Sequence, residues 1–171
     1  MGRRMGGADK GLMDYAGRPL VAAAIERLSP QVDALLVNAN RNAAAYAAYG
    51  HPVVADAVGG YAGPLAGLQA GLAACATPLL ATVPCDSPRL PADLVARLRA
   101  GLEGRADGEL AVAAAGGRWQ PVFLLCRRAV LPGLEEYLAA GGRRIEDWVR
   151  ARRHAVVEFP DPAAFANINT P

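Results

Sequence analysis

The strongest constraint on the fold of this chain is a regular alternation of short apolar runs with segments of helical pattern. Runs typical of strands lie at residues 32–37, 53–55 and 78–83, and a helical stretch follows each of them. Such an alternation favours right-handed crossover connections, and these connections build a mainly parallel sheet with helices on both faces. We therefore predict an α/β protein with three layers in a Rossmann-like arrangement.

The remaining segments extend this pattern. Helices are predicted at residues 19–28, 43–49, 64–74, 92–102, 127–139 and 144–151, and a last strand at 154–159. Apolar runs at 110–115 and 119–125 flank Gly116-Gly117, which predicts a hairpin that adds antiparallel strands to one edge of the sheet. The sequence contains no repeat or linker, so we expect residues 1–171 to form a single domain.

Composition excludes several classes of protein. With 53% hydrophobic residues and a net charge of +2, the chain is neither disordered nor basic enough to indicate nucleic-acid binding. No apolar run approaches the roughly 20 residues of a membrane span. Three cysteines, Cys75, Cys85 and Cys126, lack the spacing of a metal site, and we expect them to be small buried residues of a soluble cytoplasmic protein.

Polar residues follow three of the predicted strands. Asn38 and Asn40 come after the first run, Asp56 after the second and Asp86 after the third. Each residue alone is typical of a turn or a helix cap. Because ligands of such folds bind at the carboxyl ends of the strands, the three coincidences together predict a ligand site at that edge.

The glycine-rich start of the chain contains its only lysine, Lys10, among eighteen basic residues. A compact ammonium suits a phosphate, and nearby glycines with Arg3 and Arg4 allow backbone and charge to surround an anion. The segment is neither a Walker A loop nor a dinucleotide fingerprint, and a solvated loop is the alternative. A phosphate loop in this fold follows the first strand, so we expect the chain to be incomplete at its start.

With these residues assembled, the chain resembles the bacterial molybdenum cofactor guanylyltransferases (MobA-type), relatives of the sugar-nucleotide pyrophosphorylases. The resemblance runs nearly end to end. It rests on residues 3–11 (RRMGGADKG), 38–41 (NANR), 63–67 (GPLAG), 84–88 (PCDSP) and 167–171 (NINTP). The opening strand of that family and its Leu-Ala-Gly-Gly segment, which holds the guanine, are absent.

The resemblance implies a nucleotidyltransferase fold and the transfer of GMP from Mg-GTP to the terminal phosphate of molybdopterin, with release of pyrophosphate. Lys10 would contact the GTP phosphates, Asn38 and Asp56 the guanosine, and Asp86 the magnesium ion. Catalysis would reduce to positioning and charge neutralisation by Lys10, Arg4 and the metal, because the attacking phosphate oxygen is already ionised and requires no general base.

The resemblance also implies a second group of residues that face the pterin substrate. They are Gly63, Pro64, Gly67, Gln120, Pro121, Asn167 and Asn169.

Two other functions fit the same residues. One is a related nucleotidyltransferase, such as the cytidylyltransferase for the same cofactor or an enzyme of the sugar-nucleotide type. The other is a non-catalytic module that binds the cofactor and hands it to a molybdoenzyme apoprotein or another delivery partner. The presence of both Lys10 and Asp86 argues for the enzyme.

Overall fold

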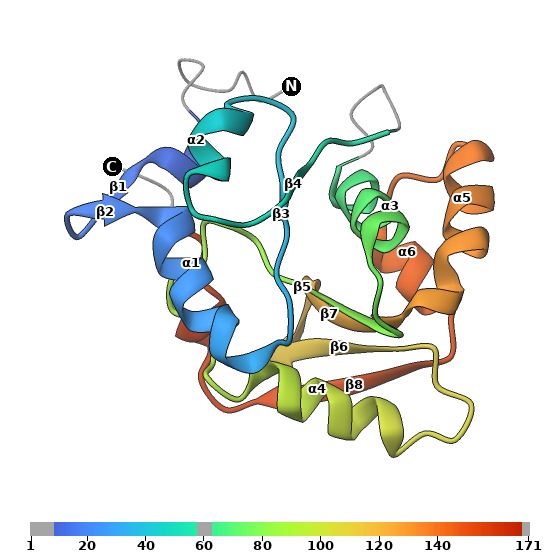
Figure 1. The fold of residues 1–171 in the computed structure, drawn as a ribbon. Helices are drawn as coiled ribbons and strands as arrows, with labels where there is room; N and C mark the ends of the chain where they lie inside the picture. The colour runs from blue at the N-terminus through green and yellow to red at the C-terminus, as the bar shows by residue number, and fades with distance from the viewer. Residues whose placement is uncertain (1–8, 58–62, 169–171) are drawn as a thin grey trace.

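The computed structural model describes residues 9–57 and 63–168, and its centre is a four-stranded sheet in the order β5–β7–β6–β8 (Figure 1). The strands are β5 (Leu79–Thr82), β6 (Leu110–Ala115), β7 (Arg118–Arg127) and β8 (His154–Phe159). β7 pairs antiparallel with β5 and β6, whereas β6 and β8 pair in parallel. Three of the four strands therefore point the same way, which confirms the predicted α/β class.

Two smaller strand pairs lie outside this sheet. β3 (Val37–Asn38) and β4 (Val53–Val54) form a parallel pair, and β1 (Asp14–Tyr15) and β2 (Arg18–Pro19) form an antiparallel hairpin that the sequence pattern did not predict. Among the residues described, no ladder joins β3 or β4 to β5. One helix, α3 (Pro64–Ala74), nevertheless contacts β3, β4 and β5.

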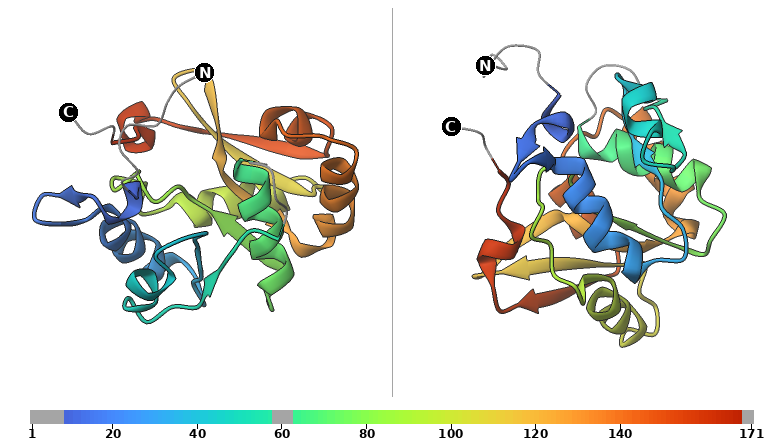
Figure 2. Two further views of the ribbon diagram at one scale, coloured as in Figure 1. Left: turned by 90° about the horizontal axis from the view of Figure 1, so that it is seen from above. Right: turned by 60° about the vertical axis from the view of Figure 1, so that its left-hand side comes forward.

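Helices cover both faces of the sheet, as the two further views show (Figure 2). Besides α3, the described helices are α1 (Leu20–Leu28), α2 (Ala43–Ala47), α4 (Leu94–Glu103), α5 (Leu131–Ala139) and α6 (Ile145–Arg150), with short 3-10 segments η2 (Lys10–Leu12), η3 (Ser29–Gln31), η4 (Arg128–Val130) and η5 (Pro162–Phe165). In the described ranges, none of them is both long and apolar enough to cross a membrane.

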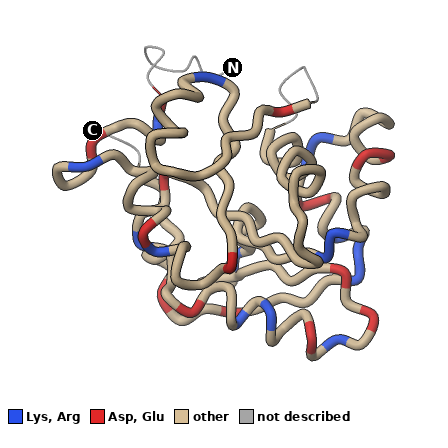
Figure 3. Tube along the Cα trace, in the orientation of Figure 1, with Lys and Arg blue, Asp and Glu red and all other residues tan. Residues whose placement is uncertain are grey.

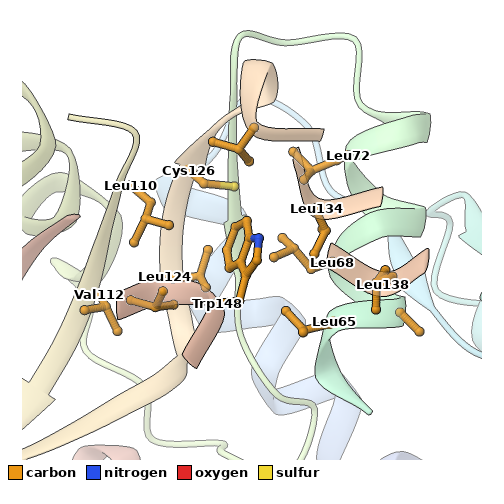
Figure 4. Packing of buried hydrophobic residues seen from close by; sticks show 13 residues of the cluster. Leu65, Leu68, Leu72, Leu110, Val112, Leu124, Cys126, Leu134, Leu138 and Trp148 are labelled. Atoms are coloured by element: carbon orange, nitrogen blue, oxygen red, sulfur yellow. The ribbon is translucent and has the colours of Figure 1, made fainter. Parts of the chain in front are cut away.

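The alternation of side chains along β6 explains why both faces of the sheet are covered. Successive residues of a strand point to opposite faces, and every residue of β6 is buried. Leu110 and Val112 pack with α3, α5 and α6 around Trp148, which is fully buried (Figure 4). Ala111 and Ala113 pack with α4 and η5 on the other face. The result is the three-layer arrangement that the sequence predicts.

Three expectations require correction. The predicted hairpin forms, but β7 lies between β5 and β6 instead of adding strands at an edge of the sheet, because it pairs along both of its sides. Of the first predicted strand, residues 32–37, only Val37 pairs in a ladder. Together with Asn38 it forms β3, because the partner strand β4 supplies only two residues for pairing. Cys75 and Cys126 are buried as expected, whereas Cys85 is exposed in the loop after β5.

Basic and acidic residues are interspersed over the described chain (Figure 3). In α4 and its N-cap, Nη1 of Arg97 lies 3.8 Å from Oδ2 of Asp93, and Nε of Arg99 lies 2.7 Å from Oε1 of Glu103. The partners are one helical turn apart in each case. Exposed pairs of this kind contribute little to stability. These two exposed pairs therefore give no indication of a ligand site.

Candidate active site

The loop after β5 brings Asp86 to Lys10, the lysine for which the sequence predicts a phosphate-binding role. The Nζ atom of Lys10, at the start of η2, lies 3.5 Å from Oδ2 of Asp86. The Asp86 side chain is 12% exposed and that of Lys10 is 55% exposed, so the carboxylate is recessed while the ammonium reaches it from the solvent side. Segments 76 residues apart in sequence thus form one charged pair at the carboxyl end of β5.

The chain's last described residues fix the loop that carries Asp86. The amide of Ile168 donates to the carbonyl oxygen of Asp86 at 2.8 Å. The Oγ atom of Ser87, which is fully buried, donates to Oδ1 of Asn167 at 2.9 Å. Asn167 therefore supports the Asp86 loop directly, a contact that the sequence pattern alone did not predict.

A second polar cluster lies where β3 and β4 end. Nδ2 of Asn38 donates to Oδ1 of Asp56 at 2.9 Å, and Nδ2 of Asn40 donates to Oδ2 at 2.7 Å. The Asp56 amide in turn donates to Oδ1 of Asn40 at 2.8 Å. Because β3 and β4 run in parallel, their carboxyl ends meet, as the sequence analysis expected. All three side chains keep partial access to solvent.

The amino-terminal turn of α3 borders this cluster. Gly63 has φ +62° and ψ −146°, a conformation that is open almost only to glycine, and Pro64 follows it at the first helical position. One turn later, a Cβ atom built on Gly67 would lie 2.6 Å from Oδ1 of Asn38. The missing side chain at Gly67 allows the helix to approach Asn38 closely.

Gln120 and Pro121 lie at an irregularity of the ladder between β6 and β7. Val112 pairs with Leu124, but the next residue, Ala113, pairs with Gln120. The extra β7 residues bulge beyond the last pair of β5, Thr82 with Leu124, and Oγ1 of Thr82 donates to the carbonyl oxygen of Val122 at 2.6 Å. A bulge of this kind re-aims side chains, and this one lies on the side of the sheet where β5 leads to Asp86.

Two residues that the sequence analysis did not assign, Asn42 and Tyr46, hold Asp9, the residue before Lys10. Asp9 accepts hydrogen bonds at both carboxylate oxygens, from the hydroxyl of Tyr46 at 2.5 Å and from Nδ2 of Asn42 at 3.0 Å. Tyr46 is 4% exposed, and Asn42 adopts a left-handed conformation before α2. The acidic residue beside the only lysine was the available sequence signal, but its partners lie 33 and 37 residues away.

The surrounding charges act on Cys85, between β5 and Asp86. Although this residue is exposed, nearby protein atoms desolvate its sulfur and raise the pKa of the thiol to about 11. The carboxylates of Asp86 and Asp9 contribute to this increase, and Lys10 opposes it. The thiol is therefore a neutral neighbour of the Lys10–Asp86 pair at physiological pH.

The structure thus brings Lys10, Asp86 and Asn167 together, and it groups Asn38, Asp56 and Gly67 beside α3. Arg4 and Asn169 lie outside the described residues. No group of three or more His, Cys, Asp or Glu side chains that could hold a metal occurs in residues 9–57 and 63–168. Asp86 is the recessed carboxylate that faces Lys10.

Known proteins are similar to this chain over most of its length. Residues 1–156 match the MobA-like NTP transferase domain. The molybdenum cofactor guanylyltransferase of Cupriavidus taiwanensis is 52% identical over 99% of this chain and 87% of its own length. That of Shewanella halifaxensis is 46% identical over 100% of this chain and 86% of its own.

Solved structures show the same fold at lower identity. Molybdopterin-guanine dinucleotide biosynthesis protein A of Archaeoglobus fulgidus matches with a TM-score of 0.71 and 21% identity, over 96% of this chain and 86% of that one. The 2-C-methyl-D-erythritol 4-phosphate cytidylyltransferase of Thermus thermophilus matches with a TM-score of 0.68 and 19% identity, over 95% and 88%.

The family model and the curated relatives therefore show that the chain is a nucleotidyltransferase, and the solved structures share its three-layer fold. Within this class, the chain belongs to the MobA-like NTP transferase family, since the match covers most of its length and the curated relatives are about half identical.

Proposed function

We propose that this protein transfers GMP from GTP to the terminal phosphate of molybdopterin, as the names of its relatives indicate. A phosphate oxygen of the pterin substrate attacks the α-phosphorus of GTP. The bond from that phosphorus to the bridging oxygen of the β-phosphate breaks, and pyrophosphate leaves with the electron pair. The nucleophile is ionised at neutral pH, so the reaction requires no general base.

The observation that carries this proposal is the Lys10–Asp86 pair. The ammonium of Lys10 neutralises charge on the triphosphate, which is the main form of catalysis in phosphoryl and nucleotidyl transfer. Mg²⁺ typically takes one or two carboxylates together with substrate phosphates, so a single recessed aspartate fits such an ion. Asp86 would hold a magnesium ion, which would neutralise charge on the phosphates. Lys10 lies 3.5 Å from the same carboxylate and offsets its negative charge.

The other candidate residues are each assigned to one of the two substrates. Asn38 and Asp56 contact the guanosine, since their amide and carboxylate groups match the polar edges of a nucleoside. They also lie near α2, which supports the residue before Lys10. Gly63, Pro64 and Gly67, with Gln120 and Pro121, face the pterin. Asn167 holds the Asp86 loop, and Arg4 and Asn169 complete the phosphate and pterin sides.

The assay that tests this proposal measures pyrophosphate release from GTP in the presence of molybdopterin, with and without Mg²⁺. The wild type should release pyrophosphate only with metal and both substrates. Asp86→Asn should lower the rate by at least about 100-fold, because it removes the metal carboxylate while keeping its shape. Unaltered magnesium-dependent turnover in Asp86→Asn would refute the assignment of the metal ligand.

We further propose that residues 1–171 act as one nucleotidyltransferase domain in the cytoplasm, where GTP is available. Its partners are then GTP and molybdopterin, followed by a molybdoenzyme apoprotein or a delivery protein that accepts the product. We propose that the protein binds neither a nucleic acid nor a membrane.

A further inference from the structure

Tyr46, in α2, contacts the residues on both sides of Lys10. Its ring packs in a small apolar cluster with Val21 and Val37, and its hydroxyl donates to Asp9 at 2.5 Å. On the same turn of chain, Asn42 donates to the other carboxylate oxygen of Asp9. The residue before Lys10 is thus held at two points by one short helix and its N-cap.

The backbone after Lys10 is held against the same tyrosine. A Cβ atom on Gly11 would collide with the Tyr46 hydroxyl, so glycine permits direct contact between the loop and the phenol. Gly11 is itself buried. The amides of Leu12 and Met13 close the short 3-10 turn by donating to the carbonyl oxygens of Asp9 and Lys10 at 3.0 and 3.1 Å. Residues on both sides of Lys10 therefore rest on Tyr46.

We propose that Tyr46 is a positioning residue, which acts through Asp9 and Gly11 to place the Lys10 ammonium beside Asp86. Lys10 has a flexible stem, and an anchored backbone reduces the conformational freedom that it loses when it binds a phosphate. Burial and the hydrogen bond to Asp9 raise the pKa of Tyr46, so the hydroxyl remains a donor throughout the physiological range. The role of Tyr46 in turnover rests on the proposed guanylyl transfer.

The effect of Tyr46 on Lys10 can be measured without any substrate. Because Lys10 is the only lysine, reductive ¹³C-methylation labels a single side-chain amine in addition to the N-terminus. Tyr46→Phe keeps the ring and removes the hydroxyl. Tyr49→Phe is the matched control, since Tyr49 packs against the same apolar cluster. We expect the Lys10 NMR signal to move in Tyr46→Phe and in Asp86→Asn, and to stay in place in Tyr49→Phe.

A second readout links this position to nucleotide binding. Tyr46→Phe should weaken GTP binding in a calorimetric titration by about tenfold, the size expected when a hydrogen bond to a charged group is lost. In a Lys10→Ala background the same substitution should have no further effect, because its action passes through Lys10. A purely structural tyrosine would lower the melting temperature and the affinity equally in both backgrounds.

These outcomes separate two kinds of failure. An unchanged Lys10 signal in Tyr46→Phe, or equal losses of GTP affinity with and without Lys10, would overturn the positioning role. If the Lys10 signal moves in Tyr46→Phe but the wild-type protein binds no GTP, the positioning role of Tyr46 stands and the proposed function is overturned instead.

Discussion

Replacing Gly67 by alanine tests whether α3 fixes Asn38 in the proposed nucleotide site. In a helix interior, glycine is about 1 kcal/mol less favourable than alanine, so the substitution would stabilise an unhindered helix. At Gly67, however, the new methyl group would lie 2.6 Å from Oδ1 of Asn38. The side chain of Asn38 must then move away from its two acceptors, Oδ1 of Asp56 at 2.9 Å and the Val54 carbonyl oxygen at 3.2 Å.

The magnitudes decide the outcome. A hydrogen bond contributes about 0.5–1.5 kcal/mol to stability, and one to a charged group about 1.5–3 kcal/mol. The loss of the Asp56 contact therefore offsets the gain in helix propensity, and the free energy of unfolding of Gly67→Ala should lie near or below that of the wild type. The displaced Asn38 should weaken GTP binding by about tenfold, which corresponds to roughly 1.4 kcal/mol.

Gly71→Ala is the control on the same helix. A Cβ atom there would meet only Leu80, with its Cδ2 atom at 3.2 Å, and a leucine methyl group can shift. This variant should bind GTP as the wild type does and should be equally stable or more stable in urea denaturation. If Gly67→Ala gained stability and kept its GTP affinity, α3 would not be constraining Asn38 and the reasoning would fail.

Three further predictions concern the loop, the thiol and the core. Lys10→Arg should reduce the rate of GMP transfer by at least about tenfold despite its retained charge, because a planar guanidinium does not replace a compact ammonium; a fully active variant would return Lys10 to the role of a solvated residue. Since the pKa of Cys85 is raised to about 11, its thiol should stay neutral below that pH. Alkylation by iodoacetamide at pH 8 should therefore be slower than for a cysteine in an unfolded peptide, and its rate should rise as the pH approaches 11. Cys85→Ser identifies the modified site, and fast labelling at pH 8 would contradict the raised pKa. Leu124→Ala should lower the free energy of unfolding by about 2–5 kcal/mol, because Leu124 is fully buried beside Trp148 in the core of Figure 4; a loss below 1 kcal/mol in urea denaturation would mean that this cluster is loosely packed.

The sequence predicts the strand-to-helix alternation well because each period is local. β6 and β8 have the predicted bounds, 110–115 and 154–159. The position of β7 between β5 and β6 was not predictable in this way, because strand order depends on pairing between distant segments. Apolar residues of β7 would be buried equally well at the edge or in the centre of such a sheet.

The same limit applies to the site. Polar residues after strands predicted the meeting of Asn38 with Asp56. The single lysine was singled out as a phosphate ligand; the structure places it beside Asp86, and its phosphate-binding role stays a prediction. The contact of Tyr46 with Asp9 was missed, because a tyrosine in an alanine-rich helix is typical of a core residue. Only the fold shows that its hydroxyl is directed at the segment before Lys10.

The central claim is guanylyl transfer to molybdopterin, and a competition experiment tests it most directly. The protein is incubated with molybdopterin, Mg²⁺ and equal concentrations of GTP and CTP, and the dinucleotide products are separated and identified by mass spectrometry. We predict that molybdopterin guanine dinucleotide forms in large excess, together with one pyrophosphate for each molecule. Predominant formation of the cytosine dinucleotide, or the absence of any dinucleotide, would contradict the proposed function.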